Sequence, residues 1–147
     1  MSGTLYTIGF TRKGAERFFG LLADAGVRVL LDTRARPDSQ LAGFARGRDL
    51  AWFLQRLCGI DYVAIAALAP GNGLLADYRR GALDWTCYAR RYLAELNADA
   101  VMRELAGISL DGACLLCAED SPDQCHRRLA AEWLQQCEPT LRLVHLR

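Results

Sequence analysis

Short apolar segments alternate with amphipathic segments along almost the whole chain of 147 residues. Segments with helical spacing of apolar side chains, or with a helix-start signal, follow most of the strand-like runs. Such alternation predicts parallel strands joined by helices that cover both faces of the sheet. We predict one α/β domain over residues 1–147, with three layers and a mostly parallel sheet of about five strands. The predicted strands are residues 5–9, 27–32, 60–65, 113–118 and 141–146.

Capping residues mark the ends of several predicted helices. Gly26 and Gly59 are placed to end the first two helices. Asp84 is placed to cap a helix that carries an aromatic stripe. Ser121, with Pro122 after it and Gln124 three positions on, predicts the start of a helix that runs to about residue 136.

Composition excludes some classes of protein and favours none strongly. A hydrophobic content of 52% fits a globular protein, and the net charge of +1 gives no overall attraction to nucleic acid or membranes. We see neither a signal peptide nor an apolar run as long as a membrane span, and therefore predict a cytoplasmic protein. In that compartment we expect reduced cysteines. The six are Cys58, Cys87, Cys114, Cys117, Cys125 and Cys137.

Chemically versatile side chains follow two of the predicted strands. Asp32 ends one strand, and a loop with Arg34, Arg36 and Ser39 follows it; Cys117 and Glu119 lie at the end of another. Ligands of parallel α/β sheets bind at the carboxyl ends of strands. We expect strand 5–9 to lie between strands 27–32 and 113–118, so that the two groups converge on one crevice.

The helix predicted after Ser121 adds a second group of candidates. His126 occupies its first inward-facing position, and Cys125 lies in its first turn, where the helix dipole lowers the pKa of a thiol. Free amides at this helix start could hold a phosphate or a carboxylate. Arg127 or Arg128 could add charge, although at least one of them should point to solvent.

Simpler interpretations exist for each of these residues. His126 could be a hydrogen-bonded core residue, Cys125 could be buried and inert, and Asp32 could pair with Arg34. Cys117, Cys125 and His126 could together bind a metal. Neighbouring helical residues diverge by about 100°, however, which makes a shared ion awkward. We therefore predict neither a metal nor a cofactor.

Three motifs in this chain resemble those of a small bacterial and archaeal family, the domain of unknown function 488. They are Thr7-Ile8-Gly9-Phe10-Thr11, the segment from Asp32 to Ser39, and Leu115-Leu116-Cys117-Ala118-Glu119 followed by Cys125-His126-Arg127. The resemblance covers essentially the whole chain but implies no reaction. The family has a histidine where this chain has Phe10. If that histidine is a catalytic base in relatives, this chain is inactive or relies on His126.

These observations favour an enzyme or enzyme-like domain that binds a phosphate-bearing ligand, either a nucleotide or a nucleic-acid component. We expect Arg34, Arg36 and Arg127 to hold the anion, with Ser39 and Cys117 also in the ligand site. Asp32 or Glu119 would be the general acid or base, His126 would carry a proton or orient Glu119, and Cys125 or Cys117 is the candidate nucleophile. The alternatives are a non-catalytic module that binds nucleic acid or protein, and a thiol or metal protein.

Overall fold

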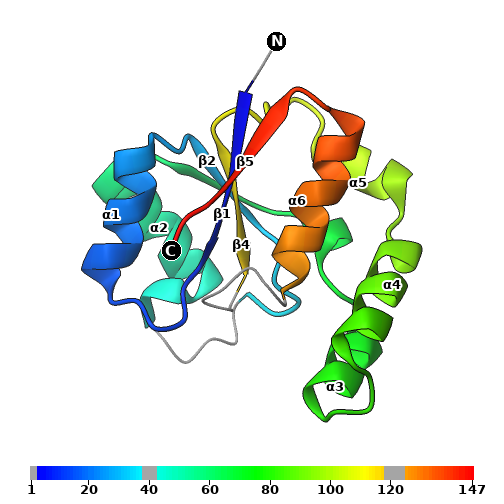
Figure 1. Ribbon diagram of the computed structural model, residues 1–147. Helices are drawn as coiled ribbons and strands as arrows, with labels where there is room; N and C mark the ends of the chain where they lie inside the picture. Colours follow the sequence, from blue (N-terminus) through cyan, green and yellow to red (C-terminus); the bar gives the residue numbers. More distant parts are fainter. Residues whose placement is uncertain (1–2, 38–42, 118–124) are drawn as a thin grey trace.

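A five-stranded, all-parallel sheet forms the centre of the protein (Figure 1). The computed structural model describes residues 3–37, 43–117 and 125–147. The strands are β1 (Gly3–Gly9), β2 (Val29–Asp32), β3 (Asp61–Ala64), β4 (Ala113–Cys117) and β5 (Leu141–His145). Their order is β3-β2-β4-β1-β5. The predicted strands are therefore confirmed, with ends that differ by a few residues.

Helices cover both faces of this sheet, as predicted. On one face lie α1 (Ala15–Ala25), the 3-10 helix η1 (Gly43–Ala45) and α2 (Gly47–Cys58). The other face carries η2 (Ala66–Leu68), α3 (Asn72–Arg79), α4 (Trp85–Glu95), α5 (Ala98–Glu104) and α6 (His126–Cys137). Each face has its own core of buried apolar side chains. None of the described helices is long and apolar enough to cross a bilayer.

Two expectations about the arrangement were wrong. β4, rather than β1, lies beside β2, because the chain inserts its fourth strand between the first two. Helix α3 was not predicted, since its eight residues follow a Pro-Gly turn and its apolar side chains, Leu74, Leu75 and Tyr78, cover little more than one turn. It packs against α4, and the two helices extend together beyond the sheet (Figure 1).

Local capping follows the sequence signals. Gly26 and Gly59 end α1 and α2 with φ angles of 75° and 64°, a left-handed conformation that glycine adopts at little cost. The carboxylate of Asp84 accepts a hydrogen bond from the amide of Cys87 at the start of α4, 2.8 Å away. The predicted start at Ser121 lies outside the described residues. Helix α6 begins at His126, so Cys125 is its N-cap and not part of its first turn.

The central position of β4 leads to a test of the packing. Leu115 on β4 has no exposed surface, whereas Leu143 on the edge strand β5 is only partly buried. We expect Leu115→Ala to lower the free energy of unfolding by about 2–5 kcal/mol, because it leaves a cavity in the core. The same truncation at Leu143 should cost less, about 1–2 kcal/mol. Urea unfolding of both variants measures this difference, and equal losses would contradict the burial described here.

Candidate functional site

The carboxyl ends of β1 and β4 lie side by side, with Gly9 in register with Cys117. After β1 the chain leaves toward α1 on one face of the sheet, and the helix that follows β4, α6, packs on the other face (Figure 1). A change of direction between neighbouring parallel strands is where open α/β sheets bind ligands. The topology therefore points to this edge of the sheet.

A buried ion pair occupies the α2 side of this edge. Arg34 donates to both carboxylate oxygens of Asp32, from Nε at 2.9 Å and from Nη2 at 2.7 Å. Its Nη1 donates to the carbonyl of Ala45 in η1 at 2.6 Å, and its backbone amide also donates to Asp32. The Tyr62 hydroxyl on β3 donates to Asp32 Oδ2 at 2.5 Å. Every favourable acceptor position of this carboxylate is thus in use.

Two further features fix this ion pair in place. The guanidinium carbon of Arg34 lies 5.5 Å from the ring centre of Phe10, just beyond β1, in the range of a cation–π contact. Burial, together with the neighbouring Asp32 carboxylate, raises the pKa of Tyr62, so its hydroxyl stays protonated as a donor. This geometry favours a role for Asp32 in positioning Arg34 near β1.

His126 lies on the opposite face of the sheet, at the start of α6. Its Nε2 lies 2.8 Å from the carbonyl oxygen of Thr33, to which it donates, and 3.1 Å from the Thr33 hydroxyl. Its ring also packs on that of Tyr92 in α4 at 5.7 Å. Burial lowers the pKa of His126 to about 4, which keeps the imidazole neutral near pH 7. A neutral ring held in this way positions the loop after β2 and is a poor proton donor.

Arg127 is fully buried beneath the same face and bridges β1 and β4. Its Nε donates to the hydroxyl of Thr7 on β1 at 3.3 Å, and its Nη1 donates to Cys117 Sγ on β4 at 3.2 Å. The Thr7 hydroxyl is also 2.6 Å from Nδ1 of His145 on β5. Since Arg127 is always a donor, the Thr7 hydroxyl oxygen accepts from it and links the guanidinium to His145. We expected at least one of Arg127 and Arg128 to point to solvent. Arg127 is buried, whereas Arg128 is half-buried and pairs with Glu132.

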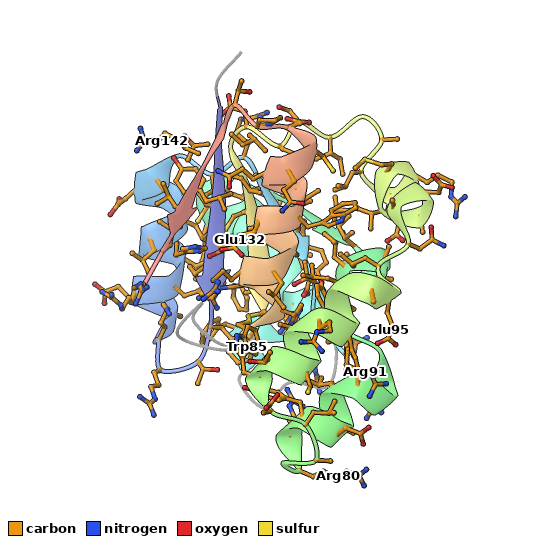
Figure 2. The ribbon with its side chains drawn as sticks, turned by 45° about the vertical axis from the view of Figure 1, so that its right-hand side comes forward. Arg80, Trp85, Arg91, Glu95, Glu132 and Arg142 are labelled. Atoms are coloured by element: carbon orange, nitrogen blue, oxygen red, sulfur yellow. A yellow bond between two sulfur atoms is a disulfide. The ribbon has the colours of Figure 1, made fainter. Side chains whose placement is uncertain are left out.

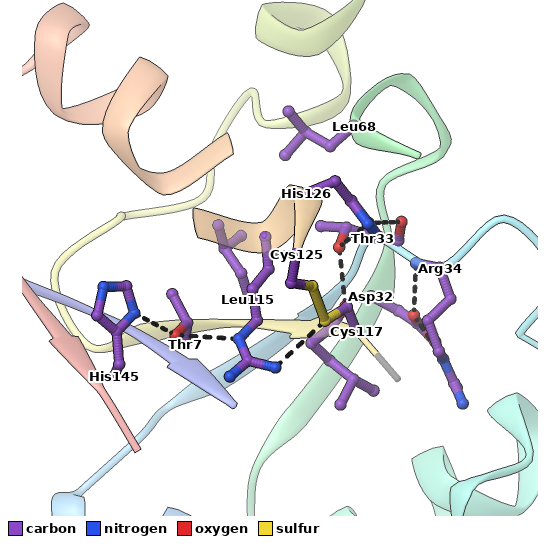
Figure 3. Close-up of a disulfide and its surroundings, with 12 residues drawn as sticks. Thr7, Asp32, Thr33, Arg34, Leu68, Leu115, Cys117, Cys125, His126 and His145 are labelled. Carbon is purple, nitrogen blue, oxygen red and sulfur yellow. Dashed lines mark hydrogen bonds and ion pairs between the residues drawn. A yellow bond between two sulfur atoms is a disulfide. The ribbon is translucent and has the colours of Figure 1, made fainter. Parts of the chain in front are cut away.

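Cys117 and Cys125 form a disulfide (Figure 3). The expectation that all cysteines are reduced was therefore wrong for this pair. Sequence reasoning placed the two residues on separate elements and did not show that α6 begins directly over the end of β4. Cys58, Cys87, Cys114 and Cys137 carry free thiols. Cys114 belongs to the core on the other face from Cys117, as their spacing along a strand predicts.

The predicted site residues thus meet at one edge of the sheet but on two faces. Asp32 and Arg34 lie on the α2 side, whereas the other described candidates, His126, Cys117, Cys125 and Arg127, lie on the α6 side. Alternation along a strand causes this division, because Asp32 and Thr33 point in opposite directions. Arg36 is exposed. Ser39 and Glu119 lie outside the described residues.

Sequence reasoning missed several residues of this edge. Tyr62 and Thr7 read as ordinary strand residues, and nothing in their local pattern signals their contacts. Arg79 at the end of α3 is exposed, and its charge contributes to the low pKa of His126. Lys13 lies just beyond β1 and is buried. The composition offered one signal for this residue, since Lys13 is the only lysine in a chain with seventeen arginines.

The comparisons with known proteins agree with the resemblance seen in the motifs. The family described as Domain of unknown function DUF488 matches residues 14–134. The chain belongs to this family. No curated protein and no solved structure matches the chain. Two of the segments that resemble the family lie at the site: the one that begins at Asp32 holds the ion pair, and Cys117 with Cys125-His126-Arg127 makes up the α6 side. In this chain the guanidinium of Arg34 lies over the ring of Phe10.

No group of three or more histidine, cysteine or carboxylate side chains that could hold a metal ion occurs within the described ranges. The possible metal set of Cys117, Cys125 and His126 gains no support from the arrangement. The two sulfurs bond to each other, and His126 Nε2 is engaged by Thr33. The described side chains at this edge carry guanidinium, carboxylate, imidazole and sulfur groups.

The buried ion pair gives a stability prediction. Asp32→Asn leaves the buried guanidinium of Arg34 without its counter-charge, so we expect a loss of about 3–5 kcal/mol in the free energy of unfolding. Tyr62→Phe removes only one hydrogen bond to the same carboxylate and should cost about 1–3 kcal/mol. Chemical denaturation of the two variants measures the difference. A mild effect of Asp32→Asn would show that Arg34 does not depend on this carboxylate.

The low pKa of His126 gives a pH prediction. An unfolded histidine binds a proton near pH 6.5, whereas folded His126 does so only near pH 4. Its contribution to stability is therefore complete above pH 6.5 and decreases as the pH falls toward 4. We expect a loss of about 2 kcal/mol between pH 7 and pH 5 that His126→Gln removes. Urea unfolding at both pH values tests it, and an unchanged pH dependence in His126→Gln would contradict the neutral state.

Proposed function

We propose that this chain is an enzyme-like domain that binds a phosphate-bearing ligand, a nucleotide or a nucleic-acid component, at the carboxyl ends of β1 and β4. The observation that carries the proposal is the approach of two buried guanidinium groups to this edge from both faces. Arg34 reaches Phe10 beyond β1, and Arg127 bridges Thr7 on β1 and Cys117 on β4.

The charge at this edge supports an anionic ligand. The one described carboxylate of the site, Asp32, is paired with Arg34. Arg127 adds a second positive charge, and Arg36 and Arg79 lie exposed on flanking segments. Planar guanidinium groups bind phosphate through two hydrogen bonds at once, which is why arginine is common in phosphate sites. The N-terminus of α6 faces the same edge and adds a favourable dipole.

We assign the catalytic roles by asking which described side chains are already engaged in hydrogen bonds or in the disulfide. Asp32 has its acceptor positions filled and is best suited to hold Arg34. Glu119, which lies outside the described residues, is then the leading general acid or base. His126 is neutral and hydrogen-bonded, which supports orientation of the site over donation of a proton. Cys125 and Cys117 are less suited to be free nucleophiles while they are bonded to each other.

Ligand binding is tested with exposed arginines, because their loss should not disturb the fold. We expect Arg36→Ala and Arg79→Ala each to weaken binding of a nucleotide by about tenfold, the effect of losing one charged hydrogen bond to phosphate. Arg142→Ala is the matched control. Arg142 is an exposed arginine at the other end of the molecule from Arg80 and α3 (Figure 2). Thermal shift and calorimetry with inorganic phosphate, mononucleotides and short oligonucleotides measure the affinities.

The panel also separates the possible ligands. Tighter binding of an oligonucleotide than of a mononucleotide, with a steep decrease in affinity as salt rises, indicates a nucleic-acid ligand. Tighter binding of the mononucleotide indicates a small-molecule site. Absence of binding by every phosphate compound, or equal weakening in the Arg142→Ala control, would rule out the proposed site.

A further inference from the structure

Cys117 and Cys125 occupy an environment that the proposed ligand site does not explain. They are bonded to each other, and their exposed fractions are 0% and 2%. Arg127, itself fully buried, donates a hydrogen bond to the sulfur of Cys117. A continuous series of polar contacts runs from His145 through Thr7 to Arg127 and ends at this sulfur (Figure 3).

The contact between Arg127 and Cys117 is worth more when the disulfide is open. A disulfide sulfur is neutral and accepts hydrogen bonds weakly. A thiolate carries a full negative charge, and its attraction to a buried guanidinium 3.2 Å away is much stronger. A neighbouring arginine lowers the pKa of a thiol for this reason. The hydrogen bond from Arg127 therefore favours the ionised form of Cys117 and opposes the effect of its burial.

Cys125 has a different source of stabilisation. It is the N-cap residue of α6. The positive end of a helix dipole favours a thiolate at this position. Cys125 also has the larger exposed fraction of the two, 2% against 0% for Cys117, so an external thiol reaches this residue first.

The other thiols of the chain lack these features. Burial raises the pKa of Cys114, which lies in the core on the opposite face of the sheet, and outweighs the lowering effect of the Arg127 charge. The hydrogen bond to Asp84 raises the pKa of Cys87, and burial raises that of Cys58. A raised pKa leaves less thiolate for reaction near pH 7. Cys117 and Cys125 are thus set apart by their pairing and by the hydrogen bond from Arg127 to Cys117.

We propose that Cys117 and Cys125 are a redox-active dithiol–disulfide couple that exchanges with thiol and disulfide compounds. In reduction, a thiolate of an external dithiol attacks Cys125 Sγ, and Cys117 leaves as a thiolate held by Arg127. The second sulfur of the external dithiol then closes its own disulfide and releases Cys125, which takes up the proton lost by the dithiol. Two electrons pass from the external dithiol to the protein, and oxidation follows the same steps in reverse.

The couple shares Arg127 with the proposed ligand site, but its exchange needs no phosphate, so it is tested without a phosphate ligand. The full chain is equilibrated in glutathione buffers of graded ratio, and cysteine ¹³Cβ chemical shifts report each residue's state whatever its exposure. We expect Cys117 and Cys125 to convert together in one reversible two-electron step, while Cys114 stays a thiol. A pair that stays a thiol in fully oxidising buffer, or a disulfide in fully reducing buffer, would overturn the proposal.

The role of Arg127 is tested by comparing Arg127→Met with Arg128→Met on the same helix. Loss of the guanidinium destabilises the thiolate of Cys117, so Arg127→Met should shift the equilibrium toward the disulfide by about tenfold for each unit by which the pKa of the thiol rises. Arg128→Met should leave it unchanged, because Arg128 pairs with Glu132. Equal behaviour of the two variants would remove Arg127 from the couple.

A second variant keeps the test decisive if Arg127→Met does not fold. Cys125→Ser leaves Cys117 as a single thiol beside Arg127. A pH titration of its ¹³Cβ shift should then give a pKa below about 8.5, the ordinary value for cysteine. A pKa at or above that value would show that Cys117 is an ordinary buried thiol.

Discussion

The fully buried guanidinium group of Arg127 determines how β1, β4 and α6 can pack against one another. Arg127 has to be compensated inside the protein, and the sheet supplies partners from β1 and β4. Those partners are close only because β4 lies beside β1 with Gly9 and Cys117 in register. The position of α6 follows as well, since Arg127 is carried by its first turn. The same interaction therefore ties the strand order, the packing of α6 and the sulfur of Cys117 together.

The other half of the edge is built on a similar principle. Asp32 and Arg34 satisfy one another in the interior, and Tyr62 and Ala45 take up remaining hydrogen-bonding groups. A buried ion pair is seldom a large source of stability, because removing both charges from water costs about as much as their attraction returns. It does hold a guanidinium in one orientation. We infer that the ion pair serves mainly to hold the guanidinium of Arg34 next to Phe10.

Much of the fold was predictable from the sequence, because it depends on local periodicity and caps. Alternating strands and helices gave the layered sheet, and Gly26, Gly59 and Asp84 marked helix ends correctly. The strand order was not predictable, since it depends on long-range pairing of β4 with β1 and β2. The apolar stripe of helix α3, from Leu74 to Tyr78, is too short to give a clear periodic signal.

The site was only partly predictable for the same reason. Sequence position placed Asp32 and Cys117 at strand ends. Which face each side chain takes depends on alternation along the strand and on the pairing register; Asp32 pairs with Leu116, so Asp32 and Cys117 point to opposite faces. The contacts of Arg127 with Thr7, and of Tyr62 with Asp32, join residues 120 and 30 positions apart. No local pattern encodes such distances. The pairing of Cys117 with Cys125 likewise depends on where α6 begins.

The central claim is that a phosphate-bearing ligand binds at the carboxyl ends of β1 and β4. The most direct measurement is the change of backbone amide NMR signals as inorganic phosphate or a mononucleotide is added. The account predicts changes concentrated in residues 9–14, 32–36 and 125–128, with little effect on the far ends of the strands. Changes concentrated on α2 or on the outer surface of α5, or none at saturating ligand, would contradict it.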